Sequence, residues 1–228
     1  MGLICFDLDG TLVDPLLGIQ RCVDRLCLEL GVPPPPRETV AGWIGFGIRE
    51  GLAGLPGMAE PAALARALDR FDTLYRAQGL YEHEVYEGVH LLLARLKRQG
   101  HRLYIVSAKP TAYARRLTFQ FDLNLIFDDI FGSDLRDRWQ PKTQVFRRLI
   151  EQGTLEPGGF MIGDRGDDMR AARDHGLRAV GVTYGYGTRE ELLGAGAEVL
   201  LDSIPALDAW LARELPDREF YDPFSRAE

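Results

Sequence analysis

The stretch ICFDLDGTLVD, residues 4–14, places two carboxylates directly after an apolar segment near the start of the chain. A short apolar run bounded by turn residues is typical of a buried strand, and we expect one over residues 3–8. Leu8 separates Asp7 from Asp9, so the two-residue period of a strand predicts that both carboxylates project from the same side. Two like charges held so close together repel each other unless a cation compensates them, which indicates a binding or catalytic site at this strand end.

The rest of the chain divides into a helical block and a longer region in which helices and strands alternate. Apolar residues recur at helical spacing over about residues 16–30 and again after Pro61, and no segment within residues 15–82 alternates like a strand. From Gly88 to about residue 215, helix and strand patterns alternate. Alternating elements of this kind predict an α/β fold with a Rossmann-like parallel sheet core that is covered by helices on both faces.

The helical block interrupts the α/β region shortly after its first strand, which predicts an inserted α-helical cap domain. We expect an α/β core domain made of residues 1–14 and 83–215, a cap domain of residues 15–82 and a C-terminal tail of residues 216–228. The tail is expected at the surface because its sequence shows no clear periodicity.

Composition and charge narrow the functional classes. Of the 228 residues, 46% are apolar and 27% are charged, and the net charge of −7 argues against a nucleic-acid polymer or an acidic membrane surface as partner. Three cysteines without a CxxC pair favour a reducing compartment over a disulfide framework. The N-terminal apolar run is too short for a signal peptide or a membrane span, so we expect a cytoplasmic protein, either a monomer or a homodimer.

Polar residues at the strand ends are the candidates for a site, because ligands of an open parallel sheet bind beyond the carboxyl ends of its strands. The candidates are carboxylates, a hydroxyl and an ammonium group that lie far apart in the sequence: Asp7, Asp9, Ser107, Lys142, Asp164 and Asp168. Carboxylates share such an edge only with a compensating cation, and Mg²⁺ prefers oxygen ligands and joins carboxylates to phosphate. Phosphate oxygens would be held by Ser107, by Lys142 and by the free main-chain amides of the turn after Asp9, at Gly10 and Thr11. Such a site suits phosphoryl transfer.

Four segments together resemble the sequence motifs of the haloacid dehalogenase-like hydrolases. They are DLDGT at residues 7–11, the apolar strand that ends in Ser107, Lys142, and GDRGDD at residues 163–168, and they span most of the chain in the order of that family. The resemblance implies an α/β core with an inserted helical cap, Mg²⁺ as cofactor, and a phosphatase that acts on a small phosphorylated metabolite.

The resemblance also implies a role for each candidate residue. Asp7 would attack phosphorus and become an aspartyl-phosphate, while Asp9 would protonate the leaving oxygen and then activate water. Asp7, Asp164 and the main-chain carbonyl of Asp9 would bind Mg²⁺, and Asp168 would bind it directly or support its ligands. Ser107 and Lys142 would bind phosphate and steady the phosphorylated intermediate.

This chain departs from the usual motifs of the family at two positions. The serine of the second motif is often followed by a polar residue, but here Ala108 follows it, so phosphate contact at this position would use the main-chain amide only. Arg165 replaces the small residue often found after the GD pair. Neither change removes a catalytic group. Asp167, beside Asp168, is expected to be a solvated neighbour.

Within the glycine-rich segment AGWIGFGIREG, residues 41–51, the stretch GWIGFG resembles the cap loop of phosphoglycolate phosphatases. DPLLGI, SAKP and YGYG elsewhere resemble a sister group that includes 5′-nucleotidases. A phosphoglycolate phosphatase-like activity is therefore expected, with a nucleoside monophosphate as the alternative substrate. Gly45, Gly47 and Arg49 are candidate substrate contacts, although a plain turn between helices explains the glycines equally well. Lys109 either helps to bind the substrate phosphate or faces solvent.

Two further functions are compatible with the same motifs. A phosphoglucomutase-like transfer uses the same core residues but needs a cap group that routes a sugar phosphate, and the sequence offers none that is diagnostic. A non-catalytic protein could keep this fold for binding or regulation. The intact set of chemical groups argues against that second possibility: Asp7, Asp9, Ser107, Lys142 and Asp164.

Overall fold

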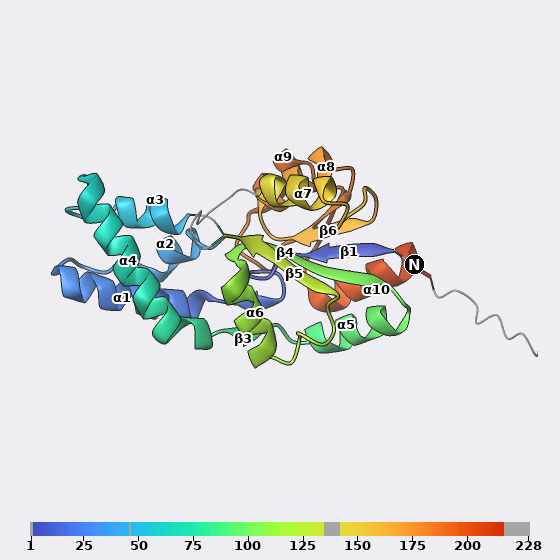
Figure 1. Cartoon of the computed structure of the whole chain (residues 1–228), viewed down its shortest axis with the longest axis horizontal. Coiled ribbons are helices and arrows are strands. Elements are labelled where there is room, and N and C mark those ends of the chain that lie inside the picture. The colour runs from blue at the N-terminus through green and yellow to red at the C-terminus, as the bar shows by residue number, and fades with distance from the viewer. Residues whose placement is uncertain (1, 46, 135–141, 217–228) are drawn as a thin grey trace, which may run out of the picture.

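The computed structural model describes residues 2–45, 47–134 and 142–216, in which a helical region lies beside a sheet flanked by helices (Figure 1). The strands are β1 (Leu3–Phe6), β2 (Val13–Asp14), β3 (Glu84–Val85), β4 (Arg102–Pro110), β5 (Asp129–Ser133), β6 (Phe160–Gly163), β7 (Arg178–Val182) and β8 (Val199–Leu201). The helices are α1 (Leu16–Leu30), α2 (Arg37–Ala41), α3 (Ile48–Ala53), α4 (Pro61–Ala77), the 3₁₀-helix η1 (Gly79–Tyr81), α5 (Val89–Arg98), α6 (Thr111–Gln120), α7 (Lys142–Glu151), α8 (Gly166–Asp174), α9 (Arg189–Ala195) and α10 (Ile204–Glu214). None of these helices combines the length and the apolar composition that a membrane crossing needs. Apart from Pro216, the expected tail lies outside the described residues.

Six strands form one parallel sheet in the order β5-β4-β1-β6-β7-β8. β1 lies between β4 and β6, so the chain builds one half of the sheet, crosses β1 and builds the other half. The α/β prediction is confirmed. This crossing point is where the strand ends of a parallel sheet leave room for a ligand.

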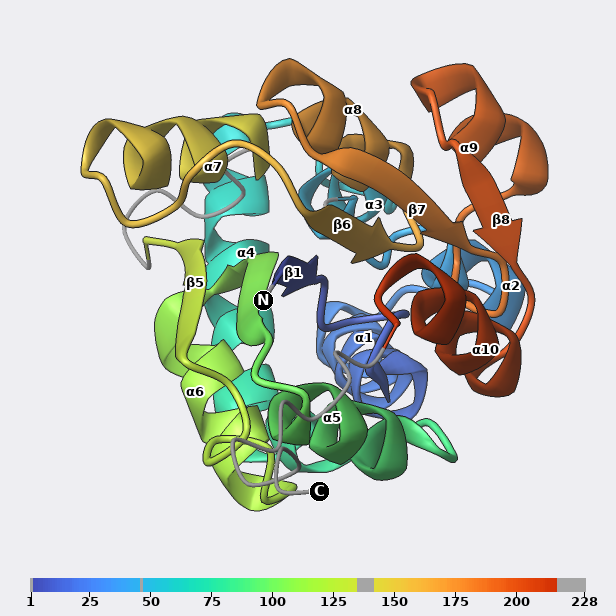
Figure 2. The same ribbon diagram turned by 90° about the vertical axis from the view of Figure 1, so that its right-hand side faces the viewer.

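Successive residues of β1 face opposite sides of the sheet, as strand geometry requires. Ile4 and Phe6 belong to an apolar cluster that includes side chains of α5, α6 and α10. Leu3 and Cys5 belong to a second cluster with α7, α8 and α9. The two groups of helices cover opposite faces of the sheet (Figure 2). This double cover explains why the strands read as continuous apolar runs.

Helices α1 to α4 form the helical region between β2 and β3. Gly31 ends α1 in the left-handed conformation with φ 68°, and Pro61 opens α4, as the sequence predicts. The apolar side chains of this region, such as Leu52 and Phe71, join the same cluster as Phe6 of β1. The helical region therefore packs directly against one side of the α/β part, and its division into a separate cap domain stays a prediction.

A two-stranded antiparallel ribbon, which the sequence analysis missed, joins the start and the end of the helical region. Val13 of β2 pairs with Val85 of β3, and Asp14 pairs with Glu84. Strands of two residues are too short for a periodic pattern, so no sequence signal marks them. The ribbon brings the segment before β3 close to the turn that follows β1.

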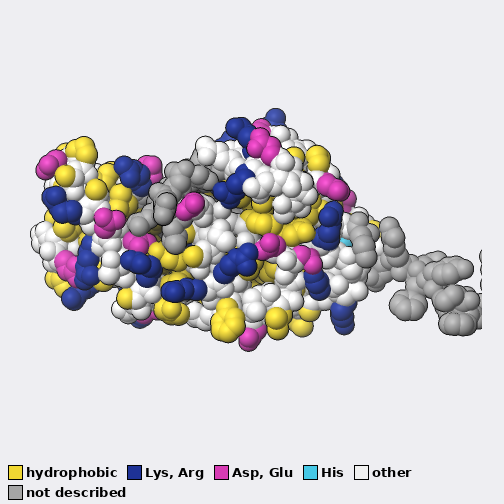
Figure 3. All heavy atoms as spheres, in the orientation of Figure 1, with side chains coloured by type: hydrophobic (Ala, Val, Ile, Leu, Met, Phe, Trp, Pro, Cys, Tyr) yellow, Lys and Arg dark blue, Asp and Glu magenta, His cyan; other side chains and the backbone are white. Residues whose placement is uncertain are grey.

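Basic and acidic side chains are interspersed on the face drawn in Figure 3. One exposed ion pair joins Lys97 Nζ to Asp128 Oδ1 at 2.6 Å. Asp128 Oδ2 also accepts a hydrogen bond of 2.8 Å from the Leu103 amide near the start of β4. This pair therefore lies at the amino end of the sheet, remote from the strand ends that carry the candidate residues.

Candidate active site

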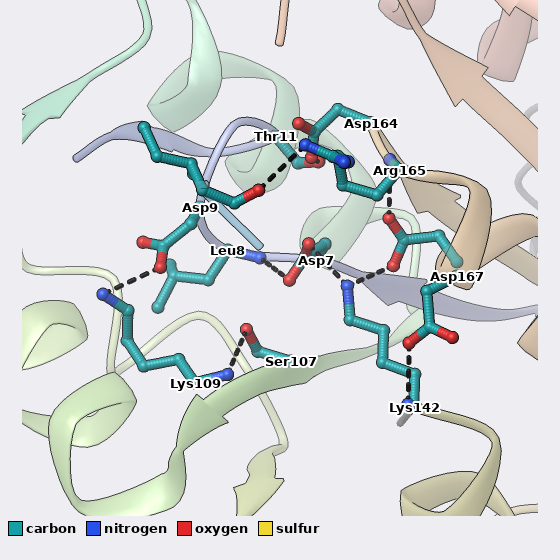
Figure 4. Close-up of polar contacts among 12 residues, drawn as sticks. Asp7, Leu8, Asp9, Thr11, Ser107, Lys109, Lys142, Asp164, Arg165 and Asp167 are labelled. Carbon is teal, nitrogen blue, oxygen red and sulfur yellow. Dashed lines mark hydrogen bonds and ion pairs between the residues drawn. The ribbon is translucent and has the colours of Figure 1, made fainter. Parts of the chain in front are cut away.

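The sequence-predicted residues converge at the carboxyl end of the sheet (Figure 4). β1 leads into Asp7 and Asp9, β4 carries Ser107, Ala108 and Lys109, β6 leads into Asp164, α7 begins with Lys142, and α8 holds Asp168 in its first turn. β1, β4 and β6 are parallel neighbours, so the polar groups at their carboxyl ends lie at the same edge of the sheet.

The chain leaves the sheet earlier than the sequence indicates. β1 ends at Phe6, not at Leu8, because the main chain then folds into a turn in which Leu12 donates to the Leu8 carbonyl at 2.9 Å. The predicted strand is therefore two residues too long, and Asp7 and Asp9 lie beyond its end. That both project from the same side stays a prediction, and the two carboxylates contact two different lysines, as Figure 4 shows.

The same turn uses the amides that the sequence analysis expected to be free for phosphate. Gly10 donates to the Val13 carbonyl at 2.8 Å, and Thr11 donates to the Leu8 carbonyl at 3.3 Å. The expectation of free amides at Gly10 and Thr11 is therefore wrong in this conformation. The hydroxyl of Thr11 has another partner, since it donates to Asp164 Oδ1 at 3.0 Å.

Three buried carboxylates form the centre of the site. Oxygens of Asp7, Asp164 and Asp168 all lie within 4.8 Å of one another. Lys142 Nζ is 2.5 Å from Asp7 Oδ2 and also donates to Asp168 Oδ1. With all three acids ionised, one ammonium group leaves two negative charges uncompensated at a place that water hardly reaches.

Burial and the neighbouring negative charges raise the pKa values of Asp164 and Asp168. Burial raises the pKa of Asp164 to about 7, and the charge of Asp7 acts in the same direction. Burial also raises the pKa of Asp168, although Lys142 opposes the change. Burial alone would lower the pKa of Lys142. The negative charges of Asp168 and Asp7 outweigh the effect of burial and raise this pKa, so the lysine stays charged.

The cluster fits a hard divalent cation. All of its donors are carboxylate oxygens, which Mg²⁺ prefers, and their residual charge matches that of the ion. The main chain packs closely against Asp164: a Cβ on Gly10, which has φ 80°, would lie 2.1 Å from Asp164 Oδ2, and one on Gly185 would lie 2.4 Å from Asp164 Cβ. The Tyr186 amide holds Asp164 Oδ2 at 2.9 Å. The residues present can therefore bind a metal at Asp7, Asp164 and Asp168, whereas the carboxylate of Asp9 lies outside this group.

The second motif places two polar side chains beside the turn. Ser107 is buried, and its Oγ accepts a hydrogen bond of 3.3 Å from the Lys109 amide. The Lys109 side chain is only 5% exposed, and its Nζ lies 2.8 Å from Asp9 Oδ2. The solvent-facing alternative for Lys109 is therefore wrong, because its ammonium group is buried against an acid. Ala108 is buried as well.

Asp167 and Arg165, next to the carboxylate cluster, both have partners within the chain. Asp167 Oδ2 accepts a 2.8 Å hydrogen bond from the main-chain amide of Lys142 and is buried, so the prediction of a solvated neighbour is wrong. Arg165 Nη1 donates to the carbonyl of Ile44 at 2.9 Å, and its Nε donates to Glu191 at 3.1 Å. Arg165 thus connects the loop after β6 to the helical region.

The glycine-rich segment of residues 41–51 contacts Arg165 of the α/β part. Gly45 has φ 107°, and a Cβ there would lie 3.3 Å from Arg165 Cγ, so a turn glycine is needed for this approach. The first three glycines of the segment lie between the end of α2 at Ala41 and the start of α3 at Ile48, so the turn between helices is confirmed. Gly47 precedes that helix, and Arg49 is exposed on it. A substrate contact for Gly45, Gly47 and Arg49 stays a prediction.

Two buried residues near Asp9 were missed by the sequence analysis. Tyr75 lies on the apolar face of α4, where it looks like an ordinary packing residue, and its hydroxyl accepts a hydrogen bond from Lys109 Nζ. His83 lies just before β3, and its Nε2 is 3.8 Å from Asp9 Oδ1. No motif marks either residue. The only sequence signal is a histidine close to the end of the helical region.

Comparison with known proteins supports a relationship across most of the chain. A family model described as haloacid dehalogenase-like hydrolase matches residues 4–182. A 5′-nucleotidase of Pseudomonas aeruginosa is 35% identical over 83% of this chain and 86% of its own length. A phosphoglycolate phosphatase of Pseudomonas putida is 32% identical over 90% of this chain and 78% of its own length. Among solved structures, a predicted phosphatase from Clostridium acetobutylicum superposes with a TM-score of 0.84 at 30% identity, covering 93% of this chain and 98% of that one.

Proposed function

The chain belongs to the haloacid dehalogenase-like hydrolase family and is a phosphatase of that family, and we propose that it hydrolyses a small phosphomonoester with Mg²⁺ and through an aspartyl-phosphate. One observation carries this proposal. Two acids separated by one residue have different environments, since Asp7 lies in a carboxylate cluster with Lys142 and Asp9 pairs with Lys109. Such a division suits one nucleophile and one proton-transfer group.

The reaction follows from these two environments. The Asp7 carboxylate attacks phosphorus, the bond to the leaving oxygen breaks, and Asp9 gives that oxygen its proton. Asp9 then takes a proton from water, which attacks the phosphorus and releases phosphate from Asp7. Burial raises the pKa of Asp9, while Lys109 opposes this, so the group can carry the proton that the first step needs.

Other residues of the chain hold the reacting groups. The Leu8 amide donates to Asp7 Oδ1 at 2.6 Å and fixes the direction of the nucleophile. Lys142 and Ser107 would bind phosphate oxygens, and the positive charge of Lys142 would compensate the negative charge of the phosphate and of Asp7. Asp7, Asp164 and Asp168 would hold Mg²⁺, with the Asp9 main-chain carbonyl as a further ligand; when bound, the ion would neutralise phosphate charge in the transition state.

A small leaving group is the favoured substrate feature. The buried residues Lys109, Tyr75 and His83 lie beside Asp9, which supports a small leaving group at this point. We propose phosphoglycolate or a similar small phosphorylated acid as substrate, and a nucleoside monophosphate is the second candidate because of the 5′-nucleotidase relative. Residues 15–82 would act as the cap that excludes water and selects the leaving group.

A phosphate-release assay tests the proposal. The protein is expected to release phosphate from p-nitrophenyl phosphate with Mg²⁺ and to lose that activity in excess EDTA, since the three-carboxylate cluster needs the ion. In a panel of phosphoglycolate, sugar phosphates and nucleoside monophosphates, phosphoglycolate is expected to have the highest kcat/KM. A tenfold preference for AMP would favour the nucleotidase alternative, and no hydrolysis of any compound would refute the phosphatase proposal.

Mg²⁺ binding is expected to strengthen as pH rises toward neutrality. Asp164 holds a proton below its pKa of about 7 in the metal-free protein, and this proton must leave before the carboxylate binds a cation. Calorimetric titration with Mg²⁺ should therefore show an affinity that rises between about pH 5.5 and 7.5 and levels off above that range. The same titration of Asp164→Asn should show weak binding at every pH. An affinity of the parent that does not change with pH would contradict the proton competition.

A further inference from the structure

The two oxygens of the Asp9 carboxylate have different surroundings. Oδ2 lies 2.8 Å from Lys109 Nζ. Oδ1 is buried and has no hydrogen-bond partner in the part of the chain that the structure describes, since His83 Nε2 is 3.8 Å away. One oxygen is therefore anchored, and the other is held in the site without a partner.

We propose that Lys109 is a positioning residue that fixes Asp9 through Oδ2 and leaves Oδ1 as the oxygen that gives and takes the proton, with Tyr75 and His83 holding the lysine in place. This inference rests on the proposed phosphatase mechanism, and it names the proton-transferring oxygen, one positioning residue and two supporting residues.

Protonation states give the contacts of Lys109, Tyr75 and His83 Nε2 a consistent direction. Burial lowers the pKa of His83 to about 2, and Lys109 acts in the same direction, so the imidazole is neutral and Nε2 can accept. Burial raises the pKa of Tyr75, as does the charge of Asp9, so the phenol keeps its proton. The Tyr75 hydroxyl, 3.1 Å from His83 Nε2, can then donate to the imidazole and accept from Lys109.

The ammonium group of Lys109 has little capacity left for a substrate. Two close acceptors hold it, Asp9 Oδ2 and the Tyr75 hydroxyl, and His83 Nε2 lies 3.4 Å away. Its side chain is 5% exposed, and the ammonium also lies 5.0 Å from the centre of the Tyr75 ring. These contacts point to a role through Asp9 instead of direct substrate binding.

The supporting residues come from a different part of the chain than the acid. Tyr75 lies on α4, and His83 lies just before β3, at the end of the helical region. Lys109 and Asp9 lie at the carboxyl end of the sheet. The position of the helical region therefore decides whether Lys109 is held, and through it whether Asp9 is aligned.

Lys109→Met tests the positioning role with p-nitrophenyl phosphate. Its leaving group needs no proton donor, so Asp7 should still be phosphorylated quickly, whereas activation of water by Asp9 should fail. We expect a burst of p-nitrophenol close to the enzyme concentration, then steady turnover about 10²-fold slower than in the parent. Phosphoenzyme trapped by acid quenching should accumulate. Asp9→Asn should show the same behaviour, and Lys109→Met in the Asp9→Asn background should change each rate by less than about twofold.

Two further variants complete the test. Lys97→Met removes a lysine from the exposed pair with Asp128 and should leave the kinetics unchanged. Tyr75→Phe keeps the ring and loses one contact of Lys109, so it should give the same burst and a steady turnover rate about tenfold lower than that of the parent. This variant keeps the test decisive if Lys109→Met does not fold.

Three outcomes would overturn the positioning role. A raised KM with unchanged kcat in Lys109→Met would show that the lysine binds substrate. If Lys109→Met lowered the turnover rate of Asp9→Asn as much as it lowers that of the parent, the lysine would act independently of Asp9. The absence of a burst in both Lys109→Met and Tyr75→Phe would place the defect before water activation. If the parent forms no phosphoenzyme, the proposed function itself fails, and the positioning role falls with it.

Discussion

Asp7→Asn is expected to lower kcat with p-nitrophenyl phosphate and Mg²⁺ by about 10⁴-fold or more, because an amide cannot attack phosphorus. The variant should also form no acid-trapped phosphoenzyme. Its fold should persist, since the change removes one of three crowded negative charges and leaves Lys142 its contact with Asp168. Without Mg²⁺, the melting temperature of the variant should therefore be no lower than that of the parent.

Asp128→Asn is the matched control for this change. It alters an aspartate that also pairs with a lysine, at 2.6 Å from Lys97, but at the amino end of the sheet. The control should keep the activity of the parent. If Asp7→Asn retained more than a tenth of the activity and still formed phosphoenzyme, another residue would be the nucleophile.

Lys142→Met is expected to reduce both activity and stability. The lysine contacts Asp7 at 2.5 Å and Asp168, and its side chain is almost fully buried, so its loss leaves two buried carboxylates without their cation. Breaking a buried pair in this way costs about 3 kcal/mol of unfolding free energy, and loss of the phosphate-binding charge should lower kcat by about 10³-fold.

The loss of stability should depend on pH and on metal. Without Mg²⁺, Asp164 and Asp168 can bind protons, because burial raises both of their pKa values. A pKa raised in the folded state stabilises the fold at low pH, and this contribution falls as pH rises through about 4 to 7. Urea unfolding of Lys142→Met should thus show a larger loss at about pH 8 than at about pH 6. Mg²⁺ should restore part of the stability but not the activity.

Lys97→Met again provides the comparison. Its pair with Asp128 is exposed, and its removal should cost less than about 1 kcal/mol at either pH. Equal stability of Lys142→Met and the parent at about pH 8 without metal would mean that the buried pairs contribute nothing to the fold.

Local patterns in the sequence predict most of the fold. The apolar run before Asp7, the helical stripe of α1 that Gly31 ends and the proline that opens α4 all record the burial of single elements. The alternation of helices and strands after Gly88 is sufficient to predict a parallel sheet. The acids at the strand ends could be found for the same reason, since a polar residue after a buried strand has a predictable place.

Short elements and main-chain hydrogen bonds could not be predicted in this way. The ribbon of β2 and β3 has two residues in each strand, which is below the length at which a period can be seen. The early end of β1 depends on a turn that uses the amides of Gly10 and Thr11. Those bonds are invisible in a pattern of apolar and polar residues.

The sequence by itself thus determined the parallel sheet, the helical region inserted after its first strand, and the acids Asp7, Asp9 and Asp164 at the strand ends. Only the tertiary structure decided which lysine compensates which acid, with Lys142 at Asp7 and Lys109 at Asp9. The physical reason is that periodicity records which side of an element is buried, whereas an ion pair depends on how distant elements pack. Asp7 and Asp9 are neighbours in the sequence, yet packing gives them separate partners and different proposed tasks.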